Sequence, residues 1–380
     1  MAGRRGNGEG AVYQRASDGR WLGAVVVGYD PEGRPRRKTV SARTRSEAVA
    51  KLKQLQRQID DGLPVPDPAL TVAKLLARWH EDVLRHQVSA STAANYRAIA
   101  DHHVLPTLGR KRVLALSPAD VDGLLSDKLD EGLSVSTVRR IRNVLSQALD
   151  QGQRWGVVHR NVASLTRGPK ARRQEGRTLT PEEARRLLSA LAGHRNEALY
   201  ALMLATGLRR GEALGLKWSD VDLDAGRLVV ARQLTRVGGA LVTSDTKTAR
   251  SRRAVDLSAP MVESLKAHKA RQAAERLALG EAWADSGFVF TSSIGTSVDP
   301  RNCYREFRGI CEAAGLGRWH PHELRHSAAS LMLAQGVKIQ VVSELLGHSS
   351  IRMTADVYGH VLAPDRRPAA EAMSEVLWGS

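Results

Sequence analysis

Four short segments in the C-terminal half of the sequence carry side chains that could do chemistry. In residues 206–212, a glycine that ends one apolar helix and an arginine that opens the next would present Arg209 from a buried junction. Farther on, Lys247 lies between two predicted strands, and a lysine on a hairpin turn can swing into a site and donate a proton. Neither segment is specific alone, because Gly- and Arg-rich helix ends are common and most such lysines are only solvated.

The third segment opens a helix with a histidine and an arginine three positions apart. His322 and Arg325 therefore project from one helical face, a spacing that also occurs by chance. The stretch from His322 to His326 also matches His-Glu-x-x-His, which on a helix can bind zinc with the glutamate as base. Two points count against a zinc site: Arg325 would oppose the charge of the metal, and no further ligand follows at the metzincin spacing.

The fourth segment places a tyrosine shortly after a Gly-His pair. Gly347 and His348 are followed by Tyr358, which falls on a short helix with polar flanks. A single tyrosine on such a helix is usually a packing residue. The significance of Tyr358 therefore depends on the other three segments.

The charge of the whole chain indicates the kind of partner. Lys and Arg number 57 against 40 Asp and Glu, so the formal net charge is +17 and the pI is near 10.4. This excess favours a nucleic-acid partner over a merely basic protein or one that binds acidic membranes, because basic side chains placed on phosphates release condensed counterions. A zinc protease would leave the charge unexplained.

The cysteines and the apolar segments of the sequence indicate the cellular compartment. The two cysteines, Cys303 and Cys311, have no metal-like spacing, so a disulfide scaffold is not expected. The N-terminus lacks an apolar signal-peptide core, and no run approaches membrane-spanning length. We therefore expect a cytoplasmic protein that does not enter a membrane.

We predict a multidomain protein, mainly α with small β-sheets. Aromatic residues make up only 4% of the chain while 42% is hydrophobic, which favours helical cores of Leu, Ala and Val. The expected divisions are a β-meander plus helix at 1–62, a helical domain at 70–165, a mixed α+β domain at 177–368 and a tail at 369–380.

The first domain is predicted to hold three strands and a helix at 46–59. Its strand-like runs, separated by Asp18-Gly19 and Glu32-Gly33, are residues 11–15, 21–28 and 37–40. Residues 1–60 hold 13 Lys and Arg against 6 Asp and Glu, a net charge of +7. Such a sheet could lie in a DNA groove, or it could be a solvated basic mini-domain. The candidate DNA contacts are Arg36, Arg37 and Lys38.

The second domain is predicted to be entirely helical. Thr71, Ser117 and Ser136 each precede an apolar-periodic stretch and are expected to cap a helix there. Near the start of the third helix is an arginine cluster that could bind the DNA backbone or simply be a solvated face. Its members are Arg139, Arg140 and Arg142.

The first helix of the third domain is predicted to begin with a capping box. Thr180 would be the N-cap, a proline follows it, and Glu183 would complete the box. Helices would then mix with a short sheet whose strands lie at 228–234 and 254–257, with a further strand at 288–290.

Taken in order, the four segments resemble the tyrosine recombinase (phage integrase) family. That family's pattern is an arginine, a hairpin lysine, His-x-x-Arg, Gly-His and a tyrosine, and no member is missing here. The likeness covers residues 177–365 through specific motifs and 70–165 through the family's helical, SAM-like core-DNA-binding domain. More loosely, residues 1–62 resemble the arm-type DNA-binding module of integrases.

The resemblance implies a role for each motif residue. Tyr358 would attack a scissile phosphate and leave a 3′-phosphotyrosine, with Arg209 and Arg325 on the phosphate oxygens. Lys247 would protonate the 5′ leaving oxygen. The remaining roles would be acid/base catalysis by His322, phosphate and tyrosine positioning by His348, and support by Glu212. Neither a metal nor another cofactor is implied.

Some details of this assignment stay open. His320 and His326 crowd the segment of His322, so the choice of histidine rests on the register of the motif; Arg210 likewise neighbours Arg209. In the tail, residues 363–377 carry a short apolar stripe that could pack on a neighbouring subunit or dock within its own chain.

The resemblance also implies a biological role and partners. The chain would integrate or excise a phage or other mobile element, acting as a tetramer on double-stranded DNA attachment sites. A directionality factor or a DNA-bending host protein could assist it. The alternatives are a type IB topoisomerase-like enzyme, a chromosome-resolving recombinase, and a DNA-binding regulator without catalysis.

Overall fold

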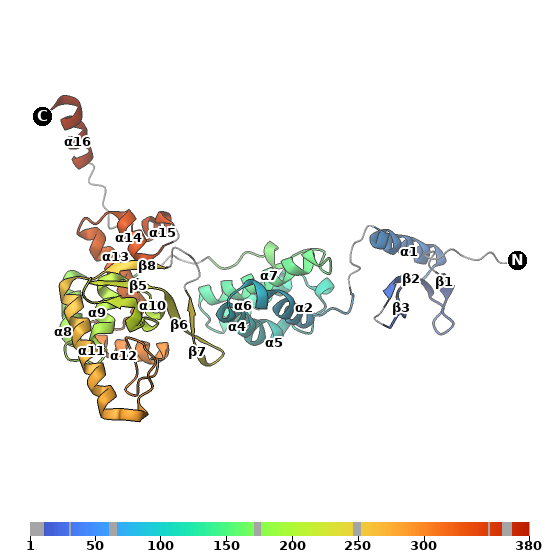
Figure 1. Cartoon of the computed structure of the whole chain (residues 1–380). Helices are drawn as coiled ribbons and strands as arrows, with labels where there is room; N and C mark the ends of the chain where they lie inside the picture. The colour runs from blue at the N-terminus through green and yellow to red at the C-terminus, as the bar shows by residue number, and fades with distance from the viewer. Residues whose placement is uncertain are drawn as a thin grey trace. The chain divides into compact units, whose positions relative to one another are not determined.

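The computed structural model describes most of the chain, in two compact units, Met1–Arg172 and Arg173–Ser380. The described residues are 11–29, 32–60, 67–170, 176–245, 252–348, 350–358 and 367–379. Within this part of the chain, no helix is long and apolar enough to cross a membrane. Helices predominate and the sheets are small, as the sequence predicts (Figure 1).

The first unit begins with the predicted meander and helix. An antiparallel sheet in the order β1-β2-β3 is followed by α1. The bounds are β1 Ala11–Gln14, β2 Trp21–Tyr29, β3 Pro35–Ala42 and α1 Arg45–Asp60. Leu52 and Leu55 of α1 are buried against Val25. A Cβ at Gly23 would lie 3.1 Å from Cβ of Leu52, so the glycine lets α1 lie close to the sheet.

The rest of this unit is helical, as predicted for residues 70–165. Its α-helices are α2 Val72–Trp79, α3 Arg85–Gln87, α4 Ala90–Ile99, α5 Leu105–Leu108, α6 Pro118–Asp130 and α7 Val135–Arg154. Thr71 caps α2 and Ser117 caps α6, both as expected. The third predicted cap is wrong by two residues: Ser134, rather than Ser136, accepts from the backbone N–H of Thr137, at 3.3 Å. Both serines suit the position, and the helix begins at the earlier one.

The second unit is mainly helical and has one large and one smaller hydrophobic core. Its α-helices are α8 Pro181–Leu191, α9 Glu197–Thr206, α10 Arg210–Leu214, α11 Ala259–Leu279, α12 Pro300–Ala313, α13 Pro321–Ala334, α14 Ile339–Leu346, α15 Ile351–Tyr358 and α16 Arg367–Trp378. The predicted capping box of α8 is confirmed, with Thr180 and Glu183 bonded reciprocally. At the other end of the unit, α16 begins two residues before the predicted tail.

Two small antiparallel sheets accompany these helices. One has the order β4-β5-β8, and the other pairs β6 with β7 as a hairpin. The strands are β4 Val221–Asp222, β5 Arg227–Val230, β6 Arg232–Val237, β7 Ala240–Asp245 and β8 Arg253–Asp256. The single strand predicted at 228–234 is therefore wrong. The buried residues Leu228, Val230 and Leu234 all lie at even positions, but β5 pairs with β8 while β6 pairs with β7.

The further strand expected at 288–290 does not form. Phe288 makes only an isolated bridge with Lys217. The carbonyl oxygen of Val289 is bonded instead to the His268 ring at 2.7 Å and to the Gln272 amide at 3.0 Å. Side chains of α11 thus occupy the place that a neighbouring strand would take, and the backbone stays satisfied without a ladder.

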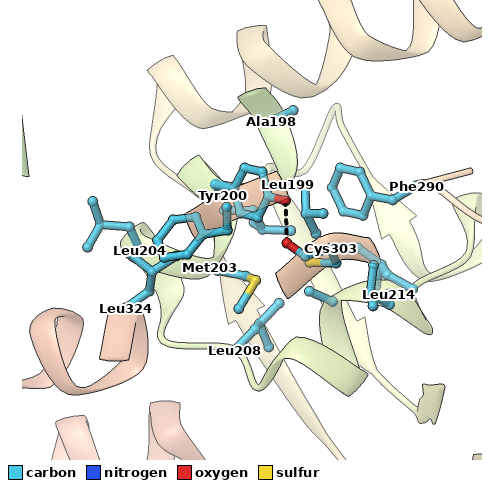
Figure 2. Close-up of a cluster of buried hydrophobic side chains, with 14 of the residues drawn as sticks. Ala198, Leu199, Tyr200, Met203, Leu204, Leu208, Leu214, Phe290, Cys303 and Leu324 are labelled. Carbon is cyan, nitrogen blue, oxygen red and sulfur yellow. Dashed lines mark hydrogen bonds between the residues drawn. The ribbon is translucent and has the colours of Figure 1, made fainter. Parts of the chain in front are cut away.

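Helix α9 runs through the core of the second unit. Leu199, Tyr200, Leu202 and Met203 on it are fully buried, so the helix is apolar on every side. The Tyr200 hydroxyl donates to the carbonyl of Cys303 at 3.0 Å, which ties α9 to α12 (Figure 2). This packing fixes the C-terminal end of α9, where the first of the four predicted segments begins.

Candidate active site

Gly207 ends α9 and brings two arginines to one place. Its φ of 66° is left-handed, and a Cβ there would lie 2.5 Å from Cδ2 of Leu346. Nη1 of Arg325 donates to the Gly207 carbonyl at 2.9 Å. Arg209 follows two residues later as the N-cap of α10. The predicted helix junction therefore does present Arg209, next to the backbone group that holds Arg325.

Glu212 holds Arg209 by two hydrogen bonds. One carboxylate oxygen accepts from the backbone N–H of Arg209 at 3.1 Å, and the other accepts from its Nη1 at 2.8 Å. The Glu212 side chain is 4% exposed, whereas that of Arg209 is 37% exposed. A buried carboxylate thus orients a guanidinium whose far side remains open to a ligand, which matches the supporting role expected of Glu212.

A third arginine, not selected by the sequence analysis, completes this network. Nη2 of Arg253 donates to Glu212 at 2.9 Å, and its Nε donates to the carbonyl of Leu345 at 2.6 Å. A Cβ on Gly347 would lie 2.9 Å from Nη1 of Arg253, so the chain before His348 passes directly over this guanidinium. The sequence could have indicated Arg253 by its position, because it stands two residues before the apolar Val255 and so on the inward-facing side of a strand.

The Glu212 carboxylate stays ionised although it is buried. Burial alone would raise its pKa, but the hydrogen bonds and charges of Arg253 and Arg209 outweigh burial and leave the pKa below its ordinary value. The buried negative charge therefore has two cationic partners, which is the condition for tolerating it in a protein interior.

Arg325 is the most buried cation of the site. It is 3% exposed, and its Nη2 has no hydrogen-bond partner among the described residues. Burial, together with the charges of Arg209 and Arg253, lowers the pKa of Arg325 to about 9, so it remains protonated at neutral pH. An unused, buried guanidinium N–H fits an anionic oxygen supplied by a ligand.

The histidines at the start of α13 have distinct surroundings. Nδ1 of His320 accepts from the backbone N–H of His322 at 3.0 Å, so His320 acts as the helix cap. The rings of His322 and His326 meet edge to face, with centroids 5.2 Å apart. Burial and neighbouring positive charges lower the pKa of both rings, which favours their neutral forms. Of the three histidines that the sequence places close together, His320 therefore caps the helix, while His322 and His326 are in ring contact.

The side chains of the zinc-like pattern have other partners. Oε2 of Glu323 accepts from the backbone N–H of His320 at 2.6 Å, which closes the first turn of α13. Nδ1 of His326 is bonded to the hydroxyl of Tyr358. The glutamate that would act as the base of a metalloprotease thus serves as a helix-capping group here.

His348 follows the glycine that ends α14. Gly347 has a φ of 63°, and Nδ1 of His348 lies 2.8 Å from Oγ1 of Thr354. Burial first, and then the charges of Arg325, Arg209 and Arg253, lower the pKa of His348 to about 4. The ring is therefore neutral at pH 7 and can exchange hydrogen bonds without adding a charge to the three arginines.

Tyr358 is the last residue of α15 and is 2% exposed. Its ring packs with Ala329 and Leu333 of α13 and with apolar residues of α14. Its hydroxyl lies 2.6 Å from Nδ1 of His326. Burial raises the pKa of Tyr358 to about 12, although the charge of Arg325 opposes this. The tyrosine is therefore both a packing residue and a polar group of the site.

The structure brings most of the predicted site residues together. Their mutual electrostatic effects connect three of the four segments. The residues so connected are Arg209, Glu212, His322, Arg325, His348 and Tyr358. The remaining predicted residue, Lys247, lies outside the described residues, just beyond β7.

The candidate DNA contacts of the first unit differ in their surroundings. Arg139 and Arg140 are exposed, but Arg142 donates to Oγ1 of Thr166 at 3.0 Å and to the Thr166 carbonyl at 2.8 Å. Arg142 therefore holds the end of its own domain. Among the residues named on the meander, Arg37 is exposed and Lys38 is half-buried. The side chain of Arg36 is not among those that the structure describes.

Comparison with protein families gives two matches along the chain. Residues 177–364 match the phage integrase family, and residues 71–129 match the N-terminal SAM-like domain of phage integrases. An integrase of Streptomyces ambofaciens is 33% identical over 391 residues, covering 99% of this chain and 98% of the relative. A XerC-like tyrosine recombinase of Caldanaerobacter subterraneus subsp. tengcongensis is 29% identical, covering 93% and 95%.

Solved structures share the fold. The integrase of transposon Tn1549, in complex with a circular intermediate DNA, superposes with a TM-score of 0.66 at 19% identity. The match covers 80% of this chain and 99% of that one. A lambda integrase dimer bound to a COC′ core site gives a TM-score of 0.58 at 21% identity, covering 94% and 96%.

The near-complete match in length and the ordered motifs define the class of enzyme as a DNA strand transferase of the tyrosine type. The chain belongs to the phage integrase family of tyrosine recombinases. Its activity is site-specific DNA recombination of the kind that integrates mobile elements.

Proposed function

We propose that Tyr358 is the nucleophile of this recombinase and that Arg209 and Arg325 bind the scissile phosphate. One observation carries the proposal: Arg325 is buried, and its Nη2 has no hydrogen-bond partner among the described residues. Two guanidinium groups can bind the non-bridging oxygens, where charge must be stabilised during phosphoryl transfer. Because these cations are supplied by the chain, the proposed reaction needs no metal.

The chemistry follows from the positions of the remaining groups. The Tyr358 hydroxyl loses its proton to a histidine of the site, and its oxygen forms a bond to phosphorus while the bond from phosphorus to the 5′ oxygen breaks, giving a 3′-phosphotyrosine and a 5′-hydroxyl. Lys247 donates the proton to that leaving oxygen. His348 and His322 donate hydrogen bonds to the phosphate. The covalent intermediate keeps the bond energy, so neither ATP nor water is consumed.

Strand exchange is the reverse step with a different strand. The 5′-hydroxyl of a partner duplex attacks the phosphotyrosine and releases Tyr358. This requires two duplexes and several active sites, so the acting species is a homotetramer on paired double-stranded DNA attachment sites. A structure of a lambda integrase tetramer on a Holliday junction, at 21% identity, supports this assembly by analogy.

The other domains bind the DNA. Residues 70–165 bind the core site, with Arg139 and Arg140 on phosphates, the catalytic domain at 177–368 cleaves it, and the meander at 1–62 binds a separate arm-type site. The tail at 369–380 packs on a neighbouring subunit. Bridging two kinds of site makes the reaction responsive to a directionality factor or to a DNA-bending host protein.

Covalent trapping tests the proposal. Tiled duplexes from the DNA that flanks this gene are screened by gel shift, and a bound duplex is then nicked near its centre so that cleavage releases a short strand and cannot be reversed. Wild type, Tyr358→Phe and Tyr304→Phe are incubated with it in a chelator and resolved under denaturing conditions. Tyr304 is the matched control, a half-buried tyrosine of the same unit.

The expected result is a protein–DNA adduct with wild type and Tyr304→Phe and none with Tyr358→Phe. Binding of the duplex without an adduct from any of the three proteins would instead indicate a DNA-binding protein without catalysis. An adduct from Tyr358→Phe would show that the nucleophile lies elsewhere.

A further inference from the structure

The hydroxyl of Tyr358 has a hydrogen-bond partner within the chain. Its partner is Nδ1 of His326, at 2.6 Å, and the two ring centroids are 5.7 Å apart. Tyr358 is 2% exposed and His326 is half-buried, so the contact is partly shielded from solvent. The ordered motif in the sequence does not include His326.

The ring of His326 is held in place by its own helix and by the segment before α8. On α13, His326 stands one turn after His322, and the two rings meet edge to face. A Cβ on Gly176 would lie 3.3 Å from Cγ and 3.4 Å from Nδ1 of His326. The backbone at Gly176 therefore covers the ring closely, and the position of Nδ1 is fixed before any substrate arrives.

The protonation states give this hydrogen bond a direction. Burial keeps the phenol protonated, since it raises the pKa of Tyr358 to about 12. His326 is neutral at pH 7, because burial and the adjacent Arg325 lower its pKa while Glu323 opposes them only in part. The phenolic O–H is therefore the donor and Nδ1 the acceptor, which places the imidazole proton on Nε2.

The other histidines of the site are placed differently. His348 uses its Nδ1 for Thr354, at 2.8 Å. His322 is more open to solvent than the other two, and its described contacts are the His326 ring and the first turn of α13. Of the three, His326 is the one whose ring nitrogen contacts the atom that must lose a proton.

We propose that His326 is the general base for Tyr358, an assignment that rests on the proposed nucleophile. As the oxygen–phosphorus bond forms, the phenolic proton moves to Nδ1 of His326, and the 5′ oxygen that leaves phosphorus takes its proton from Lys247. In the rejoining step His326 returns the proton to Tyr358, and the attacking 5′-hydroxyl gives its proton back to Lys247. Each cycle thus leaves the enzyme in its initial protonation state.

The charged and titratable groups around this pair come from two segments. They are His322, Glu323 and Arg325 of α13, and His348 after α14. The imidazolium formed by His326 would face the positive charge of Arg325. The incoming phosphate offsets this repulsion, so proton transfer is favoured only when DNA occupies the site.

Two substitutions separate proton transfer from positioning. His326→Asn keeps a carbonyl oxygen close to the place of Nδ1, and so can accept a hydrogen bond, but it cannot take up a proton at neutral pH. His326→Ala removes both functions. His194→Asn is the matched control, because it makes the same change at a half-buried histidine of this unit that contacts Glu306 instead.

Two substrates separate the base from the acid. The nicked duplex selected by gel shift is prepared with an ordinary phosphodiester and with a 5′-bridging phosphorothiolate at the cleaved bond. A thiolate leaves without being protonated, so the second substrate needs no general acid but still needs the tyrosine to lose its proton. Single-turnover cleavage rates are measured for both substrates, with gel shifts to confirm DNA binding.

We expect both His326 variants to cleave about 10²–10⁴-fold more slowly than wild type on both substrates, with DNA binding retained. Lys247→Ala should be slow on the phosphodiester and recover on the phosphorothiolate. His326→Asn at the wild-type rate would overturn the proposal and leave His326 a positioning residue. Recovery of the His326 variants on the phosphorothiolate would also overturn it. If wild type itself formed no adduct, the proposed nucleophile would have failed instead.

Discussion

Arg253 donates from Nη2 to Oε2 of Glu212 across 2.9 Å, and its Nε donates to the carbonyl of Leu345 across 2.6 Å. Glu212 in turn holds Arg209. One guanidinium therefore connects the helix start that carries the first arginine of the site with the helix end that leads to His348. The geometry of two motif segments depends on this single side chain, which lies in neither of them.

Replacing Arg253 by lysine should impair catalysis more than DNA binding. A lysine ammonium keeps the positive charge, but it cannot donate in two fixed directions as the planar guanidinium does. Displacing Arg209 or His348 by about 1 Å would slow cleavage by about 10²-fold. Single-turnover cleavage of the nicked duplex and gel shifts measure the two effects.

The control for this prediction is Arg227→Lys. Arg227 is paired with Asp256 at 2.8 Å on the same sheet, but both members of the pair are exposed, so the change should alter neither rate nor binding. Equal rates for Arg253→Lys and wild type would show that the buried network does not position the site.

The active-site glycine Gly207 should not tolerate a side chain. Its left-handed φ already strains any L-residue, and a Cβ would meet Leu346 at 2.5 Å. Gly207→Ala should therefore destabilise the protein by more than the ~1–2 kcal/mol that the backbone conformation costs. Cleavage should fall as well, because the Gly207 carbonyl accepts from Arg325.

Gly336→Ala separates strain from contact. Gly336 also has a left-handed φ, of 79°, but a Cβ there would meet nothing within 4 Å. Urea unfolding should thus show a smaller loss for Gly336→Ala than for Gly207→Ala, and cleavage should be unaffected. Similar losses in the two variants would mean that the contact with Leu346 relaxes freely.

Acidification should destabilise the protein through His348. Its pKa is lowered to about 4 in the folded state, against an ordinary value of 6.5. Between these pH values His348 is protonated in the unfolded chain but neutral in the folded one. Its contribution to the free energy of unfolding is therefore complete above pH 6.5 and is lost as the pH falls towards 4. Urea midpoints of the full-length protein should decline more steeply with acid for wild type than for His348→Gln. Parallel declines would show that His348 does not contribute.

Local signals predicted much of the fold. The caps at Thr71, Ser117 and Thr180 act within three or four residues, so the sequence alone could locate these helix starts. The strand at 228–234 was predicted wrongly for a non-local reason. Its buried residues Leu228, Val230 and Leu234 would all face one side of a single strand, and the choice of partner strands, β8 for one half and β7 for the other, divides it.

The same distinction applies to the site: residues in local motifs could be predicted, whereas contacts between distant parts of the chain could not. The ordered motif selected its residues by type and spacing. Arg253 was not selected, and His326 was left as an alternative to His322, because their partners are far along the chain: Arg253 is 41 residues from Glu212 and 92 from Leu345, and His326 is 32 from Tyr358. Such contacts follow from tertiary packing, which residue spacing does not encode.

Arg325→Lys tests the unused donor of the buried guanidinium. Nη1 of Arg325 is bonded to Gly207, whereas Nη2 is buried without a partner among the described residues. A lysine could replace one of these donors but not both. If Nη2 binds the scissile phosphate only as charge develops, cleavage should fall by about 10²–10³-fold while the Kd for the duplex stays within about threefold. A loss of affinity equal to the loss of rate would instead indicate that Arg325 binds DNA equally in the ground state and the transition state.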